Sequence, residues 1–179
     1  MNNTDIISKA IAFKDEHNPD GLVPFPFESA AKNLGDIDIV YLNLLDDVSG
    51  AIFYQDNRFK IVINNSKHRV RQYFTLAHEF AHYQLHREWL IAHPNDGFIE
   101  KSANFDNLSA LMRPDTPPLS PDEIKREKEA NNFAAEILMP KEKVKELWNL
   151  THDVSECARA FQVSISAMAI RLEKIGLAS

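Results

Sequence analysis

Several protein classes are excluded by what this sequence lacks. It has one cysteine, Cys157, so no disulfide can form within the chain, which suits a reducing cytoplasm. No apolar run approaches the ~20 residues that a membrane-spanning helix needs. The first residues, MNNTDIISKAIAFKDEHNPDG, lack the basic segment followed by an apolar stretch that marks a secretory signal. We therefore expect a cytoplasmic protein without a membrane partner.

Basic residues are also in short supply. The chain has 20 Lys and Arg against 26 Asp and Glu, a formal net charge of −6, which argues against a dedicated DNA or RNA binder. One segment, ARAFQVSISAMAIRL at 158–172, has the cadence of a helix-turn-helix. Its second helix offers only Arg171 and Lys174 as cations, both late. We therefore expect this segment to complete the core or to dock a partner, without direct nucleic-acid contact.

Three stretches in the first half of the chain have strand patterns. They are DIDIVYL at 36–42, GAIFY at 50–54 and FKIVIN at 59–64. The last two flank QDNR, whose residues favour turns, so they predict an antiparallel hairpin. The sequence therefore predicts a small sheet of about three strands.

The remaining patterns are helical. Residues 68–87 contain no glycine or proline and are apolar on nearly every side, which is typical of a central, buried helix. A second long helix is expected over 121–139, with Ser120 as its cap. Further helices follow, the last of them breaking near residues 162–163. Residues 88–120 are the least regular part, where we expect loops and one short helix.

The buried helix carries the sequence FTLAHEFAHYQLH, with His78, Glu79 and His82. Residues four apart on a helix lie one above the other, so the two histidines can share one zinc ion. Glu79 is rotated by about 100° from that pair and can reach a water molecule on the metal. In a hydrolytic zinc site the carboxylate takes a proton from this water and later delivers it to the leaving amine.

A third protein ligand must come from elsewhere in the chain. His86 follows His82 by four residues, but one zinc ion cannot be reached from three consecutive helical turns. We therefore expect His86 at the surface or in support of a ligand. In metzincins the third ligand is a histidine after a glycine turn. Leu85 and Glu88 occupy those positions here, which excludes that class.

The downstream helix offers carboxylates instead: Glu123, Glu127, Glu129 and Glu136. Glu127 shares a stripe at three- and four-residue spacings with Ala130, Asn131 and Ala134, whereas Glu129 lies on a more polar face. Glu127 is therefore the predicted third ligand and Glu129 the alternative. Asn131, one turn further, is placed to hydrogen-bond a ligating histidine.

These motifs together resemble a known family. RQYFTLAHEFAHYQLH, then EKEANNFAAEILMP, then VSISAMAIRLEKIGL are similar to the ImmA/IrrE-type zinc metallopeptidases, from about residue 24 to residue 177. The resemblance implies zinc ligands His78, His82 and Glu127, with Glu79 as general base. It also implies a bacterial or phage protein that cleaves or controls a helix-turn-helix repressor.

We accordingly expect an α+β, zincin-like fold in which a small, mainly antiparallel sheet packs against the central motif helix and several further helices. Residues 1–179 are expected to form a single metallopeptidase domain. Within it, 1–35 would supply N-terminal helices, 36–140 the catalytic core and 141–179 a C-terminal helical region.

The predicted function is zinc-dependent cleavage of a regulatory protein. The alternative is a non-hydrolytic protein that keeps the fold and sequesters a partner, or acts as one component of a toxin–antitoxin pair. The group that stabilises the developing oxyanion is left open among Tyr54, Tyr83, His93 and His152. An extended substrate can pair with an exposed sheet edge, for which we consider FKIVIN and GAIFY.

Overall fold

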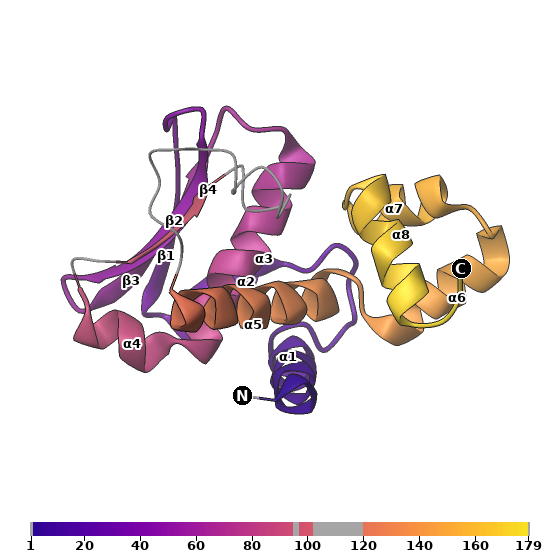
Figure 1. Ribbon diagram of the computed structural model, residues 1–179, viewed down its shortest axis with the longest axis horizontal. Helices are drawn as coiled ribbons and strands as arrows, with labels where there is room; N and C mark the ends of the chain where they lie inside the picture. The colour runs from indigo at the N-terminus through magenta and orange to yellow at the C-terminus, as the bar shows by residue number, and fades with distance from the viewer. Residues whose placement is uncertain (1, 95–96, 102–119, 179) are drawn as a thin grey trace.

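The computed structural model describes residues 2–94, 97–101 and 120–178, and only the backbone of Glu100 and Lys101. The described part of the chain forms eight helices and one four-stranded sheet (Figure 1). The helices are α1 (Asn3–His17), α2 (Phe27–Leu34), α3 (Arg69–Leu85), α4 (Arg87–Ala92), α5 (Pro121–Leu138), α6 (Lys141–Thr151), α7 (Val154–Phe161) and α8 (Ile165–Lys174). The strands are β1 (Ile37–Leu42), β2 (Val48–Gln55), β3 (Arg58–Asn64) and β4 (Phe98–Lys101). The predicted α+β class is confirmed.

The sheet has one strand more than expected. Its order is β1-β3-β2-β4, with β1 parallel to β3 and the other two pairs antiparallel. The predicted hairpin is present, and Asp56 and Asn57 form its turn with φ angles of 54° and 59°, which match a two-residue hairpin turn. The added strand β4 has four residues and lies in the segment where we expected loops and one short helix. That segment also contains α4, while residues 102–119 lie outside the described part.

Helix α3 lies between the sheet and α5 (Figure 1). Its residues from Thr75 to Tyr83 are all buried, so the prediction of a central helix is confirmed. Alanines at the contact let the two helices pack closely, because their side chains are single methyl groups that take up little space between the backbones. Ala77 and Ala81 of α3 and Ala130 and Ala134 of α5 are all 0% exposed.

An aromatic cluster holds these helices to the N-terminal part of the chain. Phe80 of α3 is fully buried, and its ring centroid lies 6.0 Å from that of Phe13 in α1 and 5.1 Å from that of Phe27 in α2. Phe13 also packs against Phe133 of α5 at 6.0 Å. Burying such rings supplies much of the hydrophobic stabilisation of a small domain.

Helix α5 begins as predicted. Ser120 accepts a hydrogen bond from the backbone of Glu123, and the Glu123 side chain accepts one from the backbone of Ser120, which completes the capping box. Because this cap fixes where the helix starts, it also fixes the direction in which each carboxylate of α5 leaves the helix.

Helices α6, α7 and α8 lie together beside the C-terminal end of α5 (Figure 1). The predicted break after α7 is confirmed at Gln162, which has a φ of 54°. Arg171 of α8 donates hydrogen bonds to Glu136 of α5 at 2.6 Å and to the backbone oxygen of Met139 at 2.9 Å. The Arg171 and Glu136 side chains are only 10% and 9% exposed. This ion pair fastens α8 to the end of α5.

Replacing Arg171 by methionine should lower the free energy of unfolding by about 2–4 kcal/mol, because a largely buried Glu136 loses its charged partner. Lys174→Met, at an exposed position of the same helix, is the matched control and should change stability by less than about 0.5 kcal/mol. Urea denaturation of both variants measures the difference. Equal effects at the two positions would show that the ion pair does not fasten α8.

Candidate metal centre

The site begins with two histidines on one face of α3. His78 and His82 are four residues apart, so their rings project in the same direction. Their Nε2 atoms lie 3.0 Å from each other, and the residues are 2% and 0% exposed. At this distance the two nitrogens can share a hydrogen bond, or both can bind one cation.

Glu127 of α5 faces this pair. Its Oε2 lies 3.2 Å from Nε2 of His78, and its Oε1 lies 3.5 Å from Nε2 of His82. The three side chains each offer one ligand atom, and these atoms all lie within 4.8 Å of one another. His78, His82 and Glu127 therefore form a group that can hold a metal ion.

The protonation of the cluster suits a cation. Burial lowers the pKa of His82 from 6.5 to about 3, outweighing the opposite effect of Glu127. For Glu127, burial alone would raise the pKa, but its close contacts with the imidazoles of His78 and His82 outweigh this and hold the pKa well below the usual 4.5. At neutral pH the cluster therefore presents a neutral His82 and an anionic carboxylate, both in the form that binds metal.

The predicted supporting residue is also at this place. Oδ1 of Asn131 lies 3.1 Å from Nδ1 of His78, on the side of the ring away from Glu127. An amide oxygen there accepts a hydrogen bond from the N–H at Nδ1, which keeps the proton on that nitrogen and leaves Nε2 with a free electron pair, as a ligating histidine needs.

Glu79 is 0% exposed and directly follows His78 on α3. The helix therefore keeps this carboxylate beside the cluster but on a different side of α3 from the two imidazoles. Its role as general base remains a prediction.

His86 takes the second of its two expected placements, in support of a ligand, whereas Glu129 is buried although it was expected on the more polar face of its helix. His86 is 8% exposed and Glu129 is 7% exposed. Nδ1 of His86 lies 3.0 Å from Nδ1 of His82, and Nε2 of His86 lies 3.1 Å from Oε2 of Glu129. Glu129, the alternative third ligand, thus contacts His86 and does not belong to the group of three.

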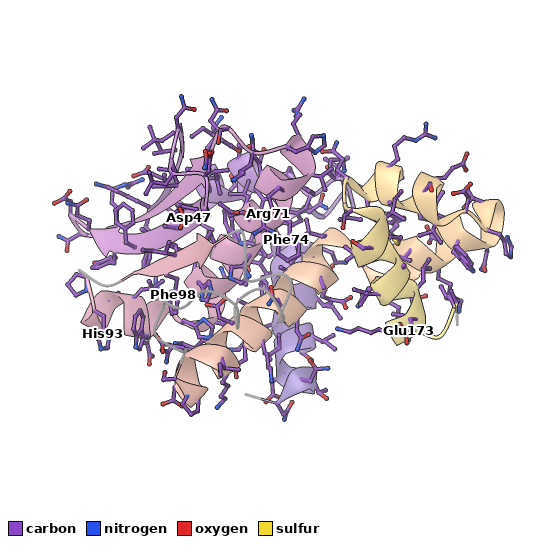
Figure 2. All side chains as sticks on the ribbon, turned by 45° about the horizontal axis from the view of Figure 1, so that its top comes forward. Asp47, Arg71, Phe74, His93, Phe98 and Glu173 are labelled. Carbon is purple, nitrogen blue, oxygen red and sulfur yellow. The ribbon has the colours of Figure 1, made fainter. Side chains whose placement is uncertain are left out.

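Aromatic side chains close the site on one side, which the sequence did not indicate. Phe98 of β4, labelled in Figure 2, stacks on His82 with ring centroids 3.9 Å apart. Trp89 packs on Phe98 at 4.6 Å, and the Arg126 guanidinium lies 4.9 Å from the Trp89 ring centre. The only sequence signal for Phe98 is an apolar pair in an irregular segment, which is too short to predict a strand.

The four candidates for oxyanion stabilisation contact residues other than the three of the metal centre. Tyr83 donates a hydrogen bond to Asp36, and Tyr54 donates one to Asn57. His93 stacks on Trp89 and His152 packs on Trp148.

The suggested sheet edges need correction. FKIVIN and GAIFY belong to β3 and β2, the two inner strands, so the expectation that either offers an edge to a peptide is wrong.

Comparison with known proteins gives a family match and a solved structure with a similar fold. A peptidase family model described as the IrrE N-terminal-like domain matches residues 35–173. The solved structure of a Mycobacterium tuberculosis transcriptional regulator has the same fold, with a TM-score of 0.62 at 18% sequence identity. The match covers 95% of this chain but only 46% of that regulator. No curated protein sequence matches the chain.

Among the helices in the described part of the chain, none is long and apolar enough to cross a membrane.

Glu127→Gln removes a charged ligand atom. Losing only an outer hydrogen-bond partner of a ligand typically weakens metal binding 10- to 100-fold, so this variant should bind zinc more weakly than that. Asp122→Asn, in the exposed first turn of the same helix, is the matched control and should leave the affinity unchanged. Competition with a chromophoric chelator measures both dissociation constants. Wild-type affinity in Glu127→Gln would exclude Glu127 as a ligand.

Proposed function

The chain belongs to the peptidase family of the IrrE N-terminal-like domain, and on that basis we propose that it is a zinc-dependent metallo-endopeptidase that cleaves a regulatory protein. The membership indicates a metallopeptidase. The choice of zinc, the roles of the residues and the substrate are our proposals.

The observation that carries the proposal is the spacing of the three ligand atoms. Zinc binds imidazole nitrogen and carboxylate oxygen at about 2.0–2.1 Å, so neighbouring ligand atoms of a tetrahedral site lie about 3.3 Å apart. Here the two Nε2 atoms lie 3.0 Å apart, and Nε2 of His78 and of His82 lie 3.2 and 3.5 Å from Oε2 and Oε1 of the Glu127 carboxylate, respectively. One ligand atom from each residue lies within 4.8 Å of the other two. Two histidines and one glutamate are also the protein ligands of hydrolytic zinc sites that keep a fourth position open.

His78, His82 and Glu127 would hold the ion through Nε2, Nε2 and a carboxylate oxygen. When bound, zinc supplies a Lewis acid that polarises the scissile carbonyl and lowers the pKa of a water molecule. Glu79 accepts a proton from that water molecule while the oxygen of the water attacks the carbonyl carbon. As the C–N bond breaks, Glu79 returns the proton to the leaving amine, so that the products are a carboxylate and an amine.

For the substrate we propose a helix-turn-helix repressor, cut at few sites. The similarity to the ImmA/IrrE-type peptidases supports this choice, because repressors are the proteins that this family commonly cleaves or controls. The solved structure with the same fold is named a transcriptional regulator, in line with a role in transcription control in a bacterium or phage. The chain spans about half of that protein, so the regulator's other half has no counterpart in the match.

Glu79→Gln should reduce cleavage of the repressor by about 10²- to 10⁴-fold, the usual contribution of a general base, while zinc content stays at one ion per chain. Glu88→Gln, an exposed glutamate of α4, is the matched control and should keep wild-type cleavage. The assay incubates each purified, zinc-loaded variant with candidate helix-turn-helix repressors and identifies fragments by mass spectrometry.

Undiminished cleavage by Glu79→Gln would show that the proposed mechanism is wrong. Binding of the repressor by the zinc-loaded wild type without any cleavage would instead favour the non-hydrolytic alternative, in which the protein sequesters its partner.

A further inference from the structure

A second set of contacts extends from the metal centre through His86 to Glu129. Nδ1 of His82 lies 3.0 Å from Nδ1 of His86, and Nε2 of His86 lies 3.1 Å from Oε2 of Glu129. All three residues are less than a tenth exposed. We propose that His86 and Glu129 are positioning residues that fix the proton of His82 on Nδ1 and hold its Nε2 ready for the metal. The proposal rests on the metal-binding part of the proposed function.

The positions of the protons follow from the partners. An ionised carboxylate only accepts hydrogen bonds, so Glu129 requires a proton on Nε2 of His86. A histidine that gives the electron pair of Nε2 to a metal ion carries its proton on Nδ1, and Nδ1 of His86 lies 3.0 Å from that atom of His82. Nδ1 of His86 is then an acceptor.

The same reasoning passes to the next ring. Because Nδ1 of His86 accepts, Nδ1 of His82 must donate the proton that joins the two rings. With this proton on Nδ1, Nε2 of His82 keeps its electron pair for the ion that His78 and Glu127 would also bind. The contacts with His86 and Glu129 thus favour the form of His82 that a metal ion requires.

An aromatic ring covers one side of the His82–His86 contact. Phe98 stacks on His82 at 3.9 Å, and its ring centroid lies 5.7 Å from that of His86. Water that would otherwise exchange with the His82–His86 contact is therefore displaced on that side by an aromatic ring.

The two ligating histidines are supported unequally. His78 contacts the neutral amide of Asn131, whereas the contacts of His82 end on the carboxylate of Glu129. A carboxylate at the end of such a contact increases the electron donation of the ring to the metal. We therefore expect that removing the His86–Glu129 pair weakens metal binding by more than the lost packing of these two side chains alone would explain.

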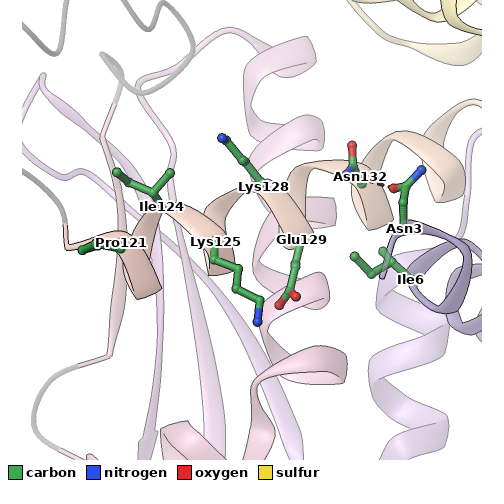
Figure 3. A pocket seen from close by; sticks show the side chains of 8 residues that line it. All are labelled: Asn3, Ile6, Pro121, Ile124, Lys125, Lys128, Glu129 and Asn132. Atoms are coloured by element: carbon green, nitrogen blue, oxygen red, sulfur yellow. Dashed lines mark hydrogen bonds between the residues drawn. The ribbon is translucent and has the colours of Figure 1, made fainter. Parts of the chain in front are cut away.

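One helix supplies both the third ligand and the end of this second set of contacts. Glu127 and Glu129 are two residues apart on α5 and point about 200° apart around it. Figure 3 shows Glu129 leaving α5 on the side opposite Lys128. The capped start of α5 therefore sets both carboxylates at once, one toward His78 and His82 and the other toward His86.

The first test measures zinc affinity by chelator competition in His86→Phe and His86→Asn. Phenylalanine keeps the ring volume but cannot accept from His82, and the affinity should fall about 10- to 100-fold. The amide oxygen of asparagine can replace Nδ1 as the acceptor, so His86→Asn should recover part of the loss. His17→Phe exchanges a histidine that packs on Phe13 in α1, and its affinity should equal that of the wild type.

Thermal unfolding of the metal-free variants separates positioning from packing. If His86→Phe unfolds at a lower temperature but binds zinc with wild-type affinity, the residue is only structural and the proposal is overturned. A weaker zinc affinity in both His86→Phe and Glu129→Leu, with rescue by His86→Asn, supports it.

The second test reads the protons directly, without metal or activity. In ¹⁵N nuclear magnetic resonance spectra of the metal-free wild type, His82 should be protonated on Nδ1 and His86 on Nε2. A proton on Nδ1 of His86 would overturn the proposal even if zinc binds tightly. Conversely, these tautomers in a protein that fails to bind zinc would contradict the proposed function while leaving the proton arrangement intact.

Discussion

The close packing of α3 on α5 is the contact on which the site depends. No single helix can present three ligands to one small cation, because three consecutive turns span too great a length. The site therefore needs a second backbone close to the first. Alanines on both helices permit this approach, and they bring a carboxylate to within 3.2 Å of a histidine that lies 49 positions earlier in the chain.

The three residues of the candidate metal centre have equally specific surroundings. Each imidazole has a polar group on the side away from the shared centre, Asn131 for His78 and His86 for His82. An aromatic ring covers His82 as well. Buried imidazoles without such partners would rotate or take up protons. Metal binding would then have to order them, which would lower the affinity for the metal.

The sequence predicted those parts of the structure that depend on local periodicity. The central helix, the capped start of α5 and the inward direction of Glu127 all follow from residues within a few turns of each other. The strand β4 could not be predicted, because its four residues are defined by pairing with β2, some 50 positions away. The burial of Glu129 was missed for a related reason. The prediction assumed one apolar stripe, which suits a helix that is covered on one side. Helix α5 instead packs against both α3 and α1, and it also contacts His86 just beyond the end of α3.

Helix α5 has a further consequence for the molecule as a whole. It carries Glu127 in its second turn and the carboxylate that binds Arg171 near its end, nine residues or about 14 Å along the same axis. A helix of this kind behaves as a stiff rod over that length. The ion pair with α8 and the candidate ligand Glu127 thus belong to one helix, and a shift of α5 along its axis would move both.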